Sequence, residues 1–117
     1  MSELWDAPIE AAASILCYPE GRAALAAARR GGRLSGSAYR RALEEFESLQ
    51  SELLLVGIDE PLAREAGELS ERHGLRGYDA VHLASALALG ADTTFVSWDG
   101  DLRHAAARSG CPVAPPD

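Results

Sequence analysis

The chain has 117 residues and a formal net charge of −7, so it has room for one domain and is not coated with positive charge for holding nucleic acid. Its two cysteines, Cys17 and Cys111, match no metal-binding or disulfide spacing. The first residues lack the basic and apolar segments of a signal peptide, and no apolar run approaches the roughly 20 residues that span a bilayer. We therefore expect one cytoplasmic domain over residues 1–117, with reduced cysteines and no membrane partner.

The first half of the chain predicts a short strand followed by two helices. Residues 8–13 are a candidate strand, and Ser14 is a candidate cap for a helix that runs to about Arg30. Pro19 either kinks the first turn of that helix or restarts it. A clear amphipathic helix follows over 37–51. Its apolar stripe comprises Tyr39, Ala42, Leu43, Phe46 and Leu49.

The middle of the chain predicts a strand over 53–58 and then two helices. Asp59 is the expected cap of the first helix, which runs to about His73 and closes at Gly74. Its apolar stripe comprises Leu62, Ala66 and Leu69. The second helix, over 78–89, is apolar on almost every side and is therefore expected to be buried.

The last segments predict a strand over 94–97, a helix over 99–109 that ends at Gly110, and a short strand over 111–114. Helices thus alternate with short apolar strands. This alternation indicates an α/β fold with a short parallel sheet covered on both faces.

Charge is distributed unevenly along the chain. Six arginines and no acid lie between Gly21 and Arg41, whereas acids dominate from Ala42 to Glu71. Such segregation marks either a phosphate-facing edge or two solvated helix faces. The six arginines are Arg22, Arg29, Arg30, Arg33, Arg40 and Arg41.

Two aspartates lie where an α/β fold places its sites. Asp99 directly follows the predicted strand 94–97, and sites of open parallel sheets lie at the carboxyl ends of strands. Its carboxylate is either a metal ligand or a helix cap. Asp79 begins the buried helix, where it is either a site residue or a helix-start residue. His82, three residues later, either orients Asp79 or packs in the core.

Glu20 is a third candidate because of its helical phase. It shares one side of the predicted helix with Leu16, Ala24 and Ala27, so it would point inward with the apolar stripe. A buried carboxylate is costly unless it is paired or binds a cation. If Pro19 breaks the phase, Glu20 is exposed instead.

Three carboxylates from separate segments could converge on one Mg²⁺ or Mn²⁺, which prefer oxygen ligands. Such a cation can polarise a phosphodiester and orient an attacking water. The chain has no glycine-rich phosphate loop and no HExxH or GxSxG motif, which removes several other enzyme classes.

Three segments together resemble sequence blocks of VapC-type PIN domains. They are residues 14–20 (SILCYPE), 75–86 (LRGYDAVHLASA) and 95–102 (FVSWDGDL). The resemblance implies a three-layer α/β/α PIN fold. It also implies that Glu20, Asp79 and Asp99 bind Mg²⁺ or Mn²⁺ and that the protein cuts RNA.

The same resemblance suggests that Ser97 helps at the metal site, and it makes neither Arg76 nor His82 a metal ligand. Asp101 and His82 are further supporting candidates, although Asp101, in the first turn of the predicted helix, is more readily explained as a favourable helix-dipole charge. The resemblance also implies a type II toxin of bacteria, held inactive by a cognate VapB-like antitoxin, and a homodimer.

The chain departs from the family pattern at its beginning. The family opens with a central strand that ends in an aspartate, and Asp6, which follows no apolar strand, does not match it. The expectation is thus an N-terminally truncated PIN-like domain with weak or no nuclease activity. The missing strand has three possible explanations: a start codon further upstream, a decayed toxin, or a strand that another chain supplies.

Two other functions compete with the nuclease. One is a non-catalytic PIN-like relic that binds an antitoxin or RNA. The other is a receiver-like signalling domain, which the absence of any lysine makes unfavourable.

Overall fold

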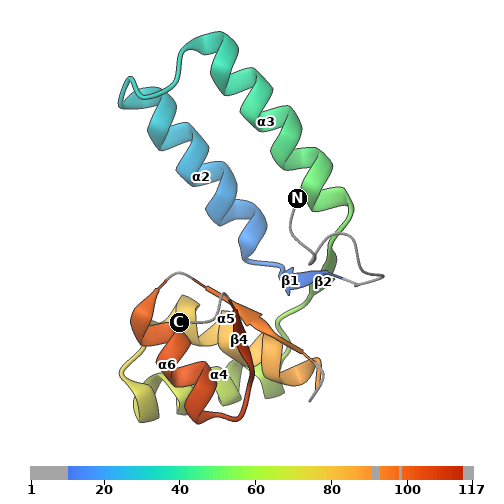
Figure 1. Cartoon of the computed structure of the whole chain (residues 1–117), viewed down its shortest axis with the longest axis vertical. Helices are drawn as coiled ribbons and strands as arrows, with labels where there is room; N and C mark the ends of the chain where they lie inside the picture. The colour runs from blue at the N-terminus through green and yellow to red at the C-terminus, as the bar shows by residue number, and fades with distance from the viewer. Residues whose placement is uncertain (1–10, 91–92, 98, 115–117) are drawn as a thin grey trace. The chain divides into compact units, whose positions relative to one another are not determined.

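The described part of the chain forms two compact units, and each unit is taken by itself. The computed structural model describes residues 11–90, 93–97 and 99–114. Unit 1 ends at Leu55 and unit 2 begins at Val56, and Figure 1 shows their elements. The sequence interpretation of Asp6 and the start of the predicted strand 8–13 fall on residues outside these ranges.

Unit 1 consists of a helical hairpin and a strand pair (Figure 1). Its elements, the last of which reaches Val56, are β1 (Ala12–Ser14), α2 (Cys17–Arg30), α3 (Gly36–Ser51) and β2 (Leu54–Val56). β1 pairs with β2. The helix predicted over 37–51 is confirmed, and the Ser35 hydroxyl caps it by accepting the N–H of Ala38 at 3.1 Å.

The start of α2 differs from the sequence prediction. Ser14, predicted to cap this helix, is the buried last residue of β1, and the helix begins at Cys17 with Leu16 in the capping position. The Ser14 hydroxyl accepts the N–H of Leu16 at 3.2 Å, so it stabilises the turn between strand and helix. The predicted end of the helix at Arg30 is confirmed.

Aromatic contacts determine which face of α2 packs against α3. The ring centroids of Tyr18 and Phe46 lie 5.7 Å apart, and a Cβ added at Gly21 would collide with the ring of Phe46. Glycine at this position therefore lets the helices approach closely. Glu20 lies off this face and is exposed, as is Ala24. The prediction that Glu20 points inward with an apolar stripe is wrong, because Tyr18 and Gly21 set the phase.

A polar cluster fastens the same two helices at their surface. The Tyr18 hydroxyl donates to Oε2 of Glu47 at 2.5 Å, and Nη1 of Arg22 donates to that oxygen and to the Tyr18 hydroxyl, each at 2.9 Å. The hydrogen bond from Tyr18 is the main reason that the pKa of Glu47 lies below its ordinary value, and the bond from Arg22 lowers it further.

Unit 2 contains three helices and a strand pair among its described residues (Figure 1). Its elements are α4 (Glu60–His73), α5 (Gly77–Ala88), β3 (Phe95–Val96), α6 (Gly100–Arg108) and β4 (Val113–Ala114). The three predicted helices are confirmed. Local signals explain the bounds of α4, because Oδ1 of Asp59 accepts the N–H of Leu62 at 2.9 Å and Gly74 adopts a left-handed φ of 67°.

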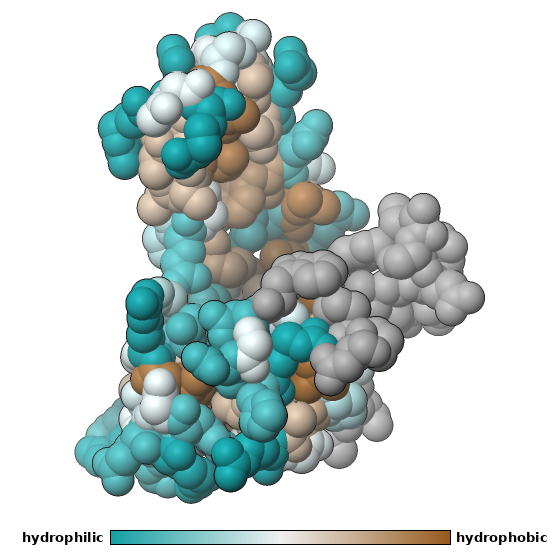
Figure 2. All heavy atoms as spheres, turned by 60° about the vertical axis from the view of Figure 1, so that its left-hand side comes forward, coloured by the Kyte–Doolittle hydropathy of each residue, from teal (hydrophilic) through white to brown (hydrophobic). Residues whose placement is uncertain are grey.

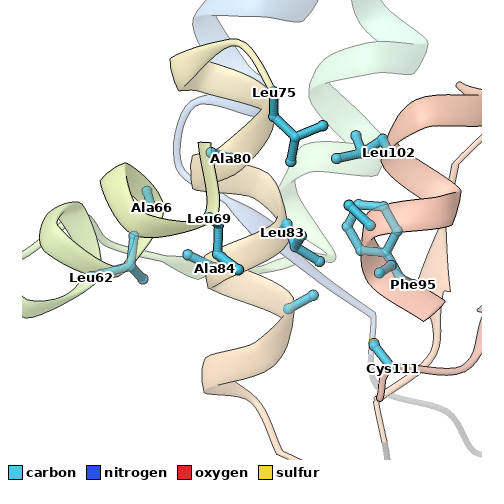
Figure 3. Packing of buried hydrophobic residues seen from close by; sticks show 13 residues of the cluster. Leu62, Ala66, Leu69, Leu75, Ala80, Leu83, Ala84, Phe95, Leu102 and Cys111 are labelled. Carbon is cyan, nitrogen blue, oxygen red and sulfur yellow. The ribbon is translucent and has the colours of Figure 1, made fainter. Parts of the chain in front are cut away.

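Helix α5 lies at the centre of the hydrophobic core of unit 2 (Figure 3). Its Leu83 and Ala84 are fully buried. The predicted stripe of α4 packs against one side of α5, and Phe95 and Leu102 of β3 and α6 lie on the other. The alanines of α5 leave room for this close packing. The predicted burial of the helix is therefore confirmed.

The strands are short and form two pairs within the described residues. β3 pairs with β4 in parallel, with Phe95 opposite Val113 and Val96 opposite Ala114. Helices thus alternate with short strands, which confirms the predicted α/β class. No helix in the described ranges has the length and apolar character needed to cross a membrane. Both cysteines are free, Cys111 in the core and Cys17 half-buried.

Candidate metal centre

Asp99 combines a capping bond with a carboxylate oxygen that remains available. It follows β3 and caps α6, since its Oδ1 accepts the N–H of Leu102 at 3.0 Å. The cap predicted as one alternative is confirmed. The cap uses Oδ1 alone, so capping leaves Oδ2 for a metal ion and the two roles are compatible.

The backbone that carries Asp99 is fixed by its neighbours. The Ser97 hydroxyl accepts the N–H of Asp99 at 3.1 Å, and the Ser97 N–H donates to the carbonyl of Ala114 at 3.2 Å. Nη1 of Arg103 donates to the Ser97 carbonyl at 3.0 Å. Ser97 and Arg103 therefore act as positioning residues for Asp99. Sequence reasoning missed Arg103, because one arginine in the second turn of a charged helix gives no specific signal.

Asp79 lies in the first turn of α5 and is half-buried. A negative charge there is favoured by the helix dipole. Leu75, just before α5, and Leu102, in the first turn of α6, are both buried in one cluster, and their side chains point toward one another in Figure 3. This packing brings the N-terminal ends of the two helices, and hence Asp79 and Asp99, into one region of unit 2.

The side chain of Arg76 lies close enough to Asp79 and Asp99 for both negative charges to influence it. Its Nη1 donates to the Tyr78 hydroxyl at 3.2 Å. The interaction with Tyr78 is the main reason that the pKa of Arg76 is raised above its ordinary value, and the negative charges of Asp79 and Asp99 raise it further. Two carboxylates therefore act on the same cation. An oxygen-donor set of this kind is suited to Mg²⁺, which is usually held by one or two carboxylates, waters and substrate phosphates.

The other predicted site residues lie around these two or in unit 1. Asp101 is exposed in the first turn of α6, and His82 is half-buried one turn after Asp79. Glu20 is in the first turn of α2 and belongs to unit 1. Within the described ranges, no three His, Cys, Asp or Glu side chains are grouped closely enough to hold a metal.

The double role of Asp99 can be separated by substitution. Asp99→Ala is expected to lower the free energy of unfolding by about 1 kcal/mol, because it removes the cap. Asp99→Ser keeps a capping oxygen and should stay within about 0.5 kcal/mol of the unchanged protein, while it removes the carboxylate. Urea unfolding followed by circular dichroism measures both. Equal stability of the two variants would show that the Leu102 bond contributes nothing.

Comparison with known proteins identifies the family of the chain. The model of the PIN domain family matches residues 3–108. Two Mycobacterium tuberculosis proteins, Ribonuclease VapC45 of strain CDC 1551 and Ribonuclease VapC49 of strain H37Rv, are each 44% identical to the chain over 115 residues. The aligned part is 97% of this chain and 80% of each relative. No solved structure matches significantly.

Proposed function

Because the chain belongs to the PIN domain family, we propose that it is a metal-dependent endoribonuclease and the toxin of a type II toxin–antitoxin pair. The observation that carries the proposal is the placement of Asp79 and Asp99 at the N-terminal ends of α5 and α6, where both act on the same cationic side chain. The names of the two relatives, both ribonucleases of the VapC series, support the activity.

In the proposed centre, Asp79 and Asp99 of unit 2 would hold Mg²⁺ or Mn²⁺. The metal-binding role that the family resemblance implies for Glu20 stays a prediction. When bound, the ion would supply a Lewis acid for the RNA phosphodiester and for the attacking water. The hydrogen bond from the Leu102 N–H to Oδ1 of Asp99 fixes the rotation of the Asp99 side chain. Ser97 fixes the backbone at Asp99.

The exposed edge of this centre carries the remaining groups. The side chain of Arg76 is exposed beside these carboxylates, and we propose that it contacts an RNA phosphate. His82 and Asp101 are proposed to support the centre, His82 by orienting Asp79 and Asp101 by adding negative charge.

The proposed partners are an RNA substrate, a VapB-like antitoxin that blocks the centre, and a second copy of the chain in a homodimer. The single-domain organisation and the cytoplasmic location stay predictions.

The test is cleavage of a mixed cellular RNA pool in Mg²⁺ or Mn²⁺ and in EDTA. It should be run on the full 117-residue chain. We expect RNA fragments only when the metal is present. Equal cleavage in EDTA would contradict the metal-dependent mechanism.

The second candidate is a non-catalytic PIN-like relic, favoured by the lack of a three-carboxylate group within the described residues. It predicts that the chain cuts no RNA in either metal, although it folds and still binds an antitoxin or RNA.

A further inference from the structure

The hairpin of unit 1 carries a dense cluster of positive charge at the turn between α2 and α3. We call this cluster the arginine tip. It consists of Arg29 and Arg30 at the end of α2, Arg33 in the turn, and Arg40 and Arg41 in α3. All five side chains are exposed, and hydrophilic atoms gather at this end of the hairpin in Figure 2. The proposed nuclease centre uses none of them.

The guanidinium groups of the tip gather over glycines. Nη2 of Arg29 and Nη1 of Arg40 lie 3.4 and 3.8 Å from the position that a Cβ on Gly36 would take. Nη1 of Arg33 lies 3.1 Å from the corresponding position on Gly31. Two exposed cations from different helices thus lie close to the same glycine, and Nη1 of Arg29 also donates to the Leu34 carbonyl at 3.4 Å. A nearby anion would stabilise this arrangement.

No carboxylate of the described residues forms an ion pair with the arginine tip, although Glu44 and Glu45 lie one turn after Arg40 and Arg41 on α3. The ion pairs within the described residues are Arg22–Glu47 and Arg64–Glu60, and neither includes the tip. The dipole of α2 favours Arg29 and Arg30 at its carboxyl end, but it gives no reason for Arg33, nor for Arg40 and Arg41 in the N-terminal half of α3. An anionic ligand would supply negative charge to pair with these arginines.

The chemistry of the tip fits a phosphate backbone better than a protein surface. Protein interfaces are centred on buried aromatic or aliphatic anchors. The residues between the arginines are instead small or polar, with Ser35, Gly36 and Ser37 at the start of α3. A guanidinium group offers paired donors that match phosphate oxygens.

We propose that the arginine tip is a second RNA-binding surface, which holds the phosphate backbone of the substrate outside the metal centre. The identity of the ligand as RNA rests on the proposed function. The surface itself rests on the convergent arginines of unit 1, which form no ion pair with a described residue. Of the two alternatives for the arginine-rich segment, the proposal favours the phosphate-facing edge.

The test is binding of a short fluorescent polyuridylate to the full chain in EDTA, where metal-dependent cleavage cannot occur. Fluorescence anisotropy should be measured between about 50 and 200 mM salt. The double variant Arg29→Gln/Arg40→Gln should bind roughly tenfold or more weakly, and its salt slope should fall by about 0.7 for each phosphate that it no longer neutralises. The variant Arg29→Lys/Arg40→Lys keeps the charge and should bind within a few-fold of the unchanged protein.

The matched control is Arg64→Gln/Arg72→Gln, which removes the same charge from exposed positions on α4. It should bind RNA with unchanged affinity and slope. Equal weakening by both double variants would show that RNA binding depends on the total charge of the protein and not on the arginine tip. Unchanged binding by the tip variant would also overturn the proposal. Polyglutamate provides the protein-like arm: if it binds as tightly and responds in the same way, the surface accepts acidic protein rather than RNA.

The result is distinguishable from a failure of the nuclease proposal. Binding of polyuridylate in EDTA reports on the arginine tip, whereas RNA cleavage in Mn²⁺ reports on the metal centre. If the chain binds RNA through the tip but never cuts it, the RNA-binding proposal stands and the nuclease proposal is refuted.

Discussion

Asp79→Asn is expected to lower metal-dependent RNA cleavage by more than about 100-fold, since the loss of an outer partner of a metal ligand alone costs about 10- to 100-fold. The side chain is half-buried in the first turn of α5. Asparagine has almost the same shape, so it keeps the packing around Leu75 and Ala80. It removes the negative charge, so the proposed metal centre would lose one of its two carboxylates in unit 2.

Two measurements separate a lost ligand from a damaged fold. The first is the rate of RNA cleavage in Mn²⁺. The second is the rise in melting temperature when Mn²⁺ is added, which reports metal binding without catalysis. Asp79→Asn should lose both and keep its metal-free melting temperature. Glu71→Gln, an equivalent change at an exposed position of α4, should lose neither. Full activity of Asp79→Asn would remove this residue from the proposed centre.

Leu83→Ala is expected to lower the free energy of unfolding of unit 2 by about 2–5 kcal/mol. Leu83 has 0% exposure and lies on α5 between α4 on one side and Phe95 on the other. Its neighbours on α5 include Ala80 and Ala84, which have no larger side chains to move into the space. The substitution therefore leaves a cavity that the helix cannot fill.

The control for Leu83→Ala is Leu89→Ala, at the end of the same helix. Leu89 is 41% exposed, so its truncation should cost less than about 1 kcal/mol. Urea unfolding followed by circular dichroism compares the two. If Leu89→Ala proved as costly as Leu83→Ala, α5 would not be the centre of the core.

Much of the candidate centre could be predicted from sequence because its two main carboxylates are tied to helix starts. Asp99 was expected to follow a strand and begin a helix, and it does both. Asp79 was expected to begin a buried helix, and α5 buries five residues between Ala80 and Ala86, while Tyr78 and Leu89 at its ends are exposed. Arg103 could not be predicted, because its bond to the Ser97 carbonyl depends on how the second turn of α6 lies against the end of β3.

Within this protein, the sequence alone determined both boundaries of α4 and the first residues of α3 and α6 to within about two residues. Capping bonds such as that from Leu102 to Asp99 join residues three apart, so local chemistry is enough to form them. The phase of α2 was decided only by tertiary structure. Periodicity placed Glu20 on an inward stripe, but contact of Tyr18 and Gly21 with Phe46, more than twenty residues away, turned another face toward α3. A partner so distant in sequence leaves no periodic signal near Glu20, and only packing of the two helices reveals it.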